Sequence, residues 1–146
     1  VIAGSGDAAY VTELKRLAEE LGVAANVKWV GHVTGSEKSR LLEQAHAFVL
    51  PSVNENFGIA PGEALAAGVP VVVTRGVAIH REVEAYQAGI VVDDTVSDLA
   101  DAMSKLREAE TTAAMSGQAA RLARDTFSIE AMQRGLVALY KKILAA

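Results

Sequence analysis

The sequence predicts an α/β domain with a Rossmann-like parallel sheet and helices on both faces. Two observations lead to this prediction. Short apolar runs rich in valine alternate with longer amphipathic segments along the 146-residue chain, which is the pattern of β-α units. The apolar runs are continuous, as in parallel strands that are buried on both faces. With 51% hydrophobic residues, the chain can bury a sizeable core, and we expect one domain over residues 1–146.

The first third of the chain predicts two strands with a helix between them. Residues 1–3 are apolar and short, as expected of a strand. Residues 8–21 then repeat apolar side chains at helical spacing, and Gly22 ends the helix. Residues 27–30 form the next expected strand, on which Trp29 is expected to be a core residue.

The middle third predicts two further β-α units. A helix around residues 37–45 leads to an apolar strand at 47–50. Pro61 suits the first turn of a helix over residues 61–67, because proline lacks the N–H that this turn leaves unpaired. Gly68 suits the turn before a strand at 69–73.

The last third predicts one short helix, one strand and three longer helices. Residues 80–86 and 89–92 are the short helix and the strand. Ser97 is expected to cap a helix that ends near Leu106, and a second helix spans residues 111–124. The final helix starts after Ser128 and has one apolar stripe, made of Ile129, Met132, Leu136, Leu139 and Ile143.

Composition excludes several classes of function. The chain has no cysteine, so it has neither a disulfide framework nor a thiolate metal site. Its three histidines show no metal-binding spacing, and its net charge of −4 disfavours non-specific nucleic-acid binding. No apolar run is long enough to span a bilayer, and no signal segment is present. We therefore expect a cytoplasmic protein with no metal, no cofactor and no nucleic-acid partner.

The most informative segment runs from Pro51 to Glu63. It joins an apolar strand to a helix start through a loop that contains Gly58, and it carries Glu55 and Glu63 eight residues apart. A helix N-terminus offers unpaired N–H groups to a phosphate, while glycine lets a ligand approach the backbone. Glutamates can accept hydrogen bonds from sugar or ribose hydroxyls. We call residues 51–63 the donor corner; with the helix starting near Pro61, Glu63 should lie in its first turn.

Two other loops should lie near the donor corner. Residues 4–6 (Gly-Ser-Gly) and residues 31–33 (Gly-His-Val) both follow expected strands. Ligands of parallel sheets bind at the carboxyl ends of the strands, so we expect the three loops to converge on one crevice. Residues 4–6 do not match a dinucleotide-binding fingerprint, because Ala9 stands where the third glycine would be.

The donor corner also carries a family resemblance. Glu55 and Glu63, followed by Ala-Leu-Ala-Ala-Gly-Val-Pro-Val-Val at 64–72, resemble the glutamate-x7-glutamate signature of retaining glycosyltransferases of family 4, which have the GT-B fold. The similarity extends over nearly the whole chain. Its other matching segments are residues 1–6, 26–33, 47–52, 88–92 and 124–128.

The resemblance implies a role for each residue of the site. Glu55 would be the catalytic residue and would bind the sugar hydroxyls, while Glu63 would bind the ribose of a nucleotide-diphosphate sugar. The main chain of Phe57–Ala60 would bind sugar and diphosphate, and Val33, with Lys38 beside it, would lie at the base. The implied donor-binding residues are Gly4, Ser5, Val33, Lys38, Glu55, Asn56, Phe57, Gly58, Ile59, Ala60 and Glu63.

The resemblance also implies parts that these 146 residues lack. In the family, an arginine and a lysine after the first strand of this domain stabilise the leaving diphosphate without a metal, and an N-terminal domain binds the acceptor. We expect this chain to start at the second strand of half a GT-B fold and to be inactive alone. Membrane association would come only through the missing part. Residues 1–3 and 48–50 would each lose a ladder partner, which an upstream remnant, direct pairing or strand exchange in a dimer would supply.

Three alternatives are weighed against the glycosyltransferase. A sugar-nucleotide epimerase or a phosphorylase would keep the GT-B architecture, although a phosphorylase needs a cofactor-binding lysine context that the sequence does not show. A non-enzymatic α/β nucleotide- or phosphate-binding module, such as a receiver-like domain, needs aspartates at the strand ends. The strand ends here carry Gly4, Gly31, Pro51 and Thr74 instead.

Overall fold

The computed structural model describes residues 1–145, which form two compact units. The first unit is Val1–Arg40 and the second begins at Leu41. No helix within residues 1–145 is both long enough and apolar enough to cross a membrane.

The first unit contains a two-stranded parallel sheet and one long helix. Its elements are β1 (Ile2–Ala3), α1 (Ala8–Glu20), the 3-10 turn Ala24–Asn26, β2 (Trp29–Gly31) and the start of α2 (Gly35–Glu43). Asp7 caps α1, because its carboxylate accepts hydrogen bonds from the N–H groups of Ala9 (2.9 Å) and Tyr10 (3.1 Å). The expectation that Trp29 is a core residue is wrong within this unit. The ring is half-buried and Lys15 Nζ lies 5.8 Å from its centroid, as expected of an aromatic face that attracts a cation.

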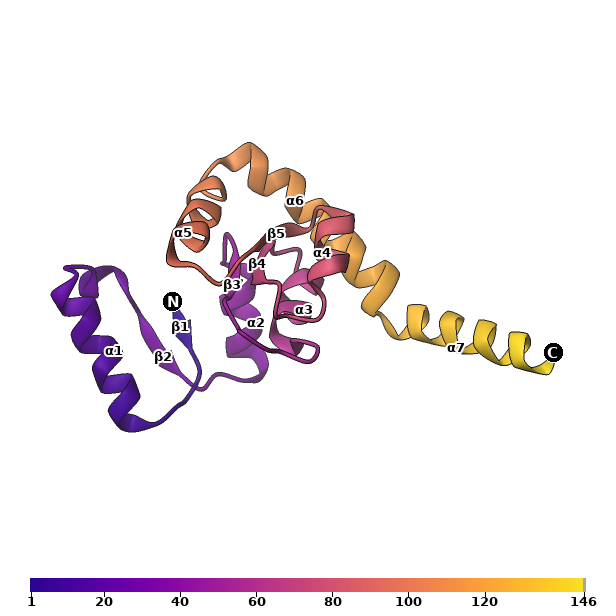
Figure 1. The fold of residues 1–146 in the computed structure, drawn as a ribbon, viewed down its shortest axis with the longest axis horizontal. Coiled ribbons are helices and arrows are strands. Elements are labelled where there is room, and N and C mark those ends of the chain that lie inside the picture. The colour runs from indigo at the N-terminus through magenta and orange to yellow at the C-terminus, as the bar shows by residue number, and fades with distance from the viewer. Residues whose placement is uncertain (146) are drawn as a thin grey trace. The chain divides into compact units, whose positions relative to one another are not determined.

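The second unit contains a three-stranded parallel sheet in the order β3-β4-β5 (Figure 1). Phe48, Val49 and Leu50 of β3 lie opposite Val71, Val72 and Val73 of β4. Its elements are β3 (Phe48–Leu50), α3 (Ile59–Ala66), β4 (Val71–Thr74), α4 (His80–Tyr86), β5 (Gly89–Val92), α5 (Val96–Lys105), α6 (Ala109–Leu122), the π-helical segment η2 (Ala123–Phe127) and α7 (Ile129–Leu144).

All strand pairs are parallel, as predicted: the first unit contains the pair β1-β2, and the second unit contains β3-β4-β5. Within residues 1–145, β1 pairs only with β2, and β3 pairs only with β4. Whether each of these two strands lacks a further ladder partner, as expected, stays a prediction. Which of the three expected solutions supplies a further partner stays a prediction.

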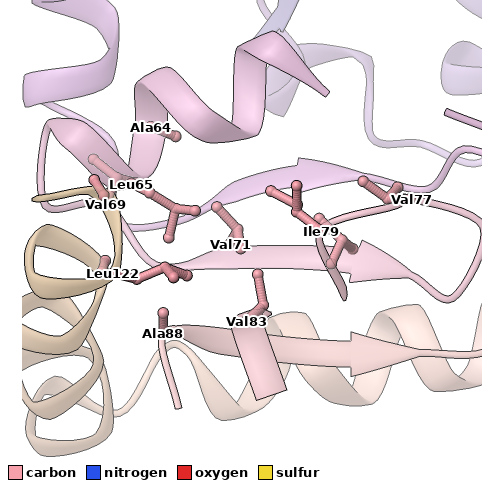
Figure 2. Packing of buried hydrophobic residues seen from close by; sticks show 12 residues of the cluster. Ala64, Leu65, Val69, Val71, Val77, Ile79, Val83, Ala88 and Leu122 are labelled. Atoms are coloured by element: carbon pink, nitrogen blue, oxygen red, sulfur yellow. The ribbon is translucent and has the colours of Figure 1, made fainter. Parts of the chain in front are cut away.

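The core of the second unit lies on both faces of β4. Val71 and Val73 face one side and pack with residues of α3, α4 and α6, among them Leu65, Val83 and Leu122 (Figure 2). Val72 faces the other side and packs with Ala102 and Leu106, at the end of α5. All four residues of β4 are buried, because successive side chains of a strand point to opposite faces and both faces are covered. The predicted parallel sheet with helices on both faces is confirmed in this unit.

Helix starts differ from the prediction at α5 but not at α7. Thr95, not Ser97, caps α5, because the Thr95 hydroxyl oxygen accepts a hydrogen bond from the N–H of Asp98 at 3.1 Å. Ser128 caps α7 as predicted, and its hydroxyl oxygen accepts from Ala131 N–H at 3.1 Å. No residue of α7 is buried, so its apolar stripe faces solvent within this structure.

Candidate functional site

The donor corner is held in place by the turn that follows β4. The N–H of Glu55 donates to the carbonyl of Gly76 at 2.9 Å, and the N–H of Ala78 donates to the carbonyl of Glu55 at 3.0 Å. These two bonds form an isolated parallel bridge between Glu55 and Val77. The main chain at Glu55 is therefore fixed by residues more than twenty positions away, while its side chain is half-buried.

The turn and the corner approach each other more closely than any side chain would allow. A Cβ atom built on Gly76 would lie 2.1 Å from the carbonyl oxygen of Val53. Beside this contact, the Thr74 hydroxyl donates to the carbonyl of Ser52. Since Thr74 is buried, this bond also satisfies the one polar side chain among the buried residues described. The backbones of residues 52–55 and 74–78 are therefore packed directly against each other.

The helix start of the donor corner leaves two N–H groups available. Gly58 is the N-cap of α3 in the left-handed region (φ 78°, ψ 71°), and it brings no capping side chain. Its carbonyl accepts from the N–H of Gly62 at 3.1 Å. The third helical residue is the buried Pro61, which has no N–H. The N–H groups of Ile59 and Ala60, on an exposed stretch of chain, remain for a ligand.

This geometry corrects one expectation about Glu63. The helix begins at Ile59 rather than near Pro61, so Glu63 is its fifth residue and lies in the second turn. The reason is the left-handed conformation of Gly58, which ends the loop two residues earlier than the proline predicts. Glu63 is half-buried.

Glu63 faces a groove of about 510 Å³ between α3 and η2. Two of its lining residues are in contact: the rings of Phe57 and Phe127 meet edge to face, with centroids 5.4 Å apart. This contact connects the glycine-containing loop to the π-helical segment. The groove is lined by Phe57, Ile59, Gly62, Glu63, Ala66, Ala120, Ala123, Arg124, Phe127 and Ser128.

The structure brings most of the predicted site residues together. Glu55, Asn56, Phe57, Gly58, Ile59, Ala60 and Glu63 all lie in the donor corner of the second unit. The carboxylate of Glu55 makes no hydrogen bond or ion pair with other residues of the range 1–145, and Asn56 is exposed. Both side chains are open to a ligand.

The other four predicted residues lie in the first unit. Gly4 and Ser5 follow β1, while Val33 and Lys38 follow β2. The two loops meet within this unit, since the N–H of Gly4 donates to the carbonyl of Gly31 at 2.7 Å. Convergence of these two loops is thus observed, and their convergence with the donor corner stays a prediction.

Sequence reasoning missed the turn of residues 74–78 and the contact of Phe127 with Phe57. The contact of this turn with the donor corner and the contact of the two rings have no local signature, because each joins segments that are far apart in the sequence. The Arg-Gly pair at 75–76 directly after a valine strand could have marked the turn. Nothing in the sequence pattern marks Phe127 as a neighbour of the site.

The fold and the corner define a class of protein: an α/β domain that presents a helix start and two carboxylates at the carboxyl ends of parallel strands. Residues 1–123 match the model of the family described as glycosyl transferases group 1. The chain therefore belongs to the glycosyl transferases group 1 family.

Relatives of known name agree with this assignment. The chain is 34% identical over 147 aligned residues to D-inositol 3-phosphate glycosyltransferase of Corynebacterium jeikeium, covering 98% of this chain and 35% of that protein. It is 47% identical over 74 residues to an uncharacterized glycosyltransferase of Methanocaldococcus jannaschii, covering 51% of this chain and 18% of that protein. The chain thus spans about a third of the length of the first of these relatives.

Solved structures show the same fold. Sucrose-phosphate synthase from Thermosynechococcus elongatus superposes with a TM-score of 0.80 at 23% identity, over 97% of this chain and 36% of that one. HepE of Anabaena in complex with UDP superposes with a TM-score of 0.80 at 21% identity, over 96% of this chain and 40% of that one. The predicted fold, part of a GT-B glycosyltransferase, is confirmed. These relatives and structures do not favour the epimerase, the phosphorylase or the receiver-like module.

Proposed function

We propose that this chain is the donor-binding portion of a retaining glycosyltransferase of family 4, which moves a sugar from a nucleotide-diphosphate sugar to an acceptor. Family membership supports sugar transfer in general. Structures of HepE with UDP and with UDP-glucose support a nucleotide sugar as the donor. Because the chain spans about a third of its relatives, the complete reaction belongs to a longer protein, and these residues alone are inactive.

One observation carries the proposal: the start of α3 has no capping side chain and lies between Glu55 and Glu63. The positive end of the helix dipole and the N–H groups of Ile59 and Ala60 suit an anion. Carboxylates on either side suit hydroxyl groups. A nucleotide-diphosphate sugar has both kinds of group in one molecule, with its diphosphate between two hydroxyl-rich rings.

The proposed role of each residue is the one that the family resemblance implies. Glu55 accepts hydrogen bonds from the sugar hydroxyls, and Glu63 accepts them from the ribose. The main chain from Phe57 to Ala60 binds the sugar and the diphosphate. When the glycosyl bond breaks, negative charge grows on the diphosphate, and donors already in position stabilise it without reorganisation.

The first unit would complete the donor site. We place the base beside the main chain of Val33, with Lys38 next to it, and we include Gly4 and Ser5 among the donor-binding residues. These assignments rest on the family resemblance and on the contact between Gly4 and Gly31.

Binding of nucleotides to the 146-residue chain tests the donor site. Amide chemical shifts are recorded during titration with UDP, GDP and UDP-glucose, on the wild type and on Glu63→Ala. Glu110→Ala is the matched control, because Glu110 lies in the first turn of α6, away from the donor corner. We expect shifts centred on Gly58, Ile59 and Glu63 that weaken in Glu63→Ala only. Shifts centred elsewhere, or no shifts at millimolar nucleotide, would contradict the proposal.

Retention and independence of metal are tested on the complete parent enzyme. The anomeric configuration of the product at first turnover, read by NMR, should match that of the donor. Activity should persist in excess EDTA. An inverted product or loss of turnover with EDTA would refute the corresponding part of the proposal.

A further inference from the structure

The turn after β4 carries an arginine that is held by two carboxylates from two different elements. Arg75 Nη1 lies 3.1 Å from Glu84 Oε1 on α4, and Arg75 Nε lies 3.1 Å from Asp93 Oδ1, just after β5. The hydrogen bond to Glu84 and, to a smaller extent, the hydrogen bond to Asp93 raise the pKa of Arg75. The two donors belong to one rigid planar group, so both bonds together fix the direction of the side chain.

The backbone of Arg75 is fixed as well. Its N–H donates to the carbonyl of Val92 at 3.2 Å, which continues the pairing of β4 with β5. Arg75 is therefore anchored at its main chain to β5 and at its side chain to α4 and to the residue after β5. The next residue is Gly76, whose carbonyl accepts the N–H of Glu55.

Movement of this turn must reach the donor corner. Gly76 contacts the carbonyl of Val53 so closely that no Cβ would fit, and Ala78 N–H donates to Glu55. A rotation of the chain at Arg75 would break the bridge at Glu55 or would push residues 53–55. Within residues 1–145, the main chain at Glu55 has no backbone hydrogen-bond partner other than Gly76 and Ala78.

We infer that Arg75 is a positioning residue for Glu55. Through its ion pairs with Glu84 and Asp93 it holds the turn of residues 74–78, and the turn holds the main chain from which the Glu55 carboxylate projects. This inference rests on the proposed function for its relevance to sugar binding. It adds a residue that touches neither sugar nor nucleotide.

An isolated ion pair at this exposure contributes little to stability, and the three side chains are 47–66% exposed. The effect of Arg75 is therefore local rather than global. Losing it should increase opening of the bridge while the second unit stays folded. A local measurement is needed to detect this effect.

The experiment compares amide hydrogen exchange in the 146-residue chain without ligand. Variants are Arg75→Gln, Arg75→Lys and Glu84→Gln. Arg16→Gln is the matched control, because Arg16 is 59% exposed and pairs with Glu20 inside α1. We expect exchange at the amides of Glu55 and Ala78 to rise about two- to fivefold in Arg75→Gln. The β4 amides and the urea midpoint should stay unchanged, and Arg16→Gln should match the wild type.

Two further comparisons distinguish a positioning role of Arg75 from a general contribution to the stability of the second unit. Arg75→Lys should give an intermediate rise, since one ammonium group cannot reproduce the two fixed donors. The double variant Arg75→Gln with Glu84→Gln should raise the exchange rates by less than the product of the two single-variant rises, because both substitutions break the same contact. Unchanged exchange at Glu55 and Ala78 in Arg75→Gln would overturn the inference, as would equal rises throughout the second unit.

Ligand titration then addresses the link to the sugar. Affinity for UDP-glucose should fall more than affinity for UDP in Arg75→Gln, because Glu55 meets only the sugar. Equal losses for both ligands would overturn the assignment to Glu55. If the wild type binds neither ligand, the proposed function fails, while the exchange data still decide whether Arg75 holds the bridge.

Discussion

Replacing Gly58 by alanine tests how tightly the start of α3 is built. Gly58 and Gly68 both have φ in the left-handed region, at 78° and 74°. They differ in the space around them. A Cβ on Gly58 would lie 2.7 Å from Pro61 Cγ and 3.3 Å from Val77 Cγ1, whereas a Cβ on Gly68 would meet nothing closer than 3.8 Å. Gly68→Ala is therefore a control that contains the backbone effect without the clash.

The expected free-energy changes follow from these two contributions. Placing alanine in a left-handed conformation costs about 1–2 kcal/mol, which applies to both variants. Overpacking a well-filled site costs about 1–3 kcal/mol more, and it applies only at Gly58. The neighbours cannot easily give way, because Pro61 is a buried ring and Val77 is fully buried. We expect Gly58→Ala to lower the free energy of unfolding by about 2–5 kcal/mol and Gly68→Ala by about 1–2 kcal/mol.

Urea unfolding of the wild type and both variants, followed by the amide signals of β4, measures these differences. The slope of free energy against urea should be the same in all three proteins, so that midpoints report stability. If the two variants lie within about 0.5 kcal/mol of each other, the close packing of Gly58 against Pro61 and Val77 would be refuted.

Three further predictions concern other sites. In the complete parent enzyme, Glu63→Ala should weaken the binding of UDP and of UDP-glucose alike, whereas Glu55→Ala should impair mainly binding of the sugar-bearing donor and turnover, each by about 1.5–3 kcal/mol. Kinetics with product inhibition by UDP measures both effects, and equal effects of Glu55→Ala on the two ligands would contradict the division of roles. Thr95→Ala should lower the free energy of unfolding by about 1 kcal/mol through loss of the α5 cap, and Ser97→Ala should lower it by less than about 0.5 kcal/mol. Thermal unfolding measures the two effects, and it would show the reverse order if Ser97 were the cap. Gly117→Ala, inside α6 with open space around the position, should raise stability by about 0.5–1 kcal/mol, and a drop in melting temperature would mean that the position is not open.

The parts of the fold that the sequence predicts are those set by local composition. The valine run of β4 predicts a strand buried on both faces, and the structure confirms this for every residue of β4. The start of α7 is predicted from Ser128, because a serine directly before an apolar stripe indicates an N-cap. At α5, both Thr95 and Ser97 could cap the helix. Only the bond from Asp98 N–H separates them, and that bond depends on where the chain leaves β5.

The features that the sequence does not predict are set by contacts between distant segments. The helix start at Ile59 rather than Pro61 depends on Gly58 packing over Val77, which follows a different strand. The bridge at Glu55 likewise depends on the turn at Gly76. Composition and spacing indicate the glutamates and the glycine of the site, and tertiary packing decides how their backbone is supported.

The exposure of α7 has a consequence for spectroscopy of this chain. A 16-residue helix with no buried residue must rely mainly on its own backbone hydrogen bonds and its serine cap, because most helical stability in proteins comes from packing of the apolar face. Its ellipticity should therefore decline gradually with temperature, without a sharp midpoint, while the sheet of the second unit melts cooperatively. A sloping circular-dichroism baseline before the main transition would then report fraying of α7 and not loss of the donor corner.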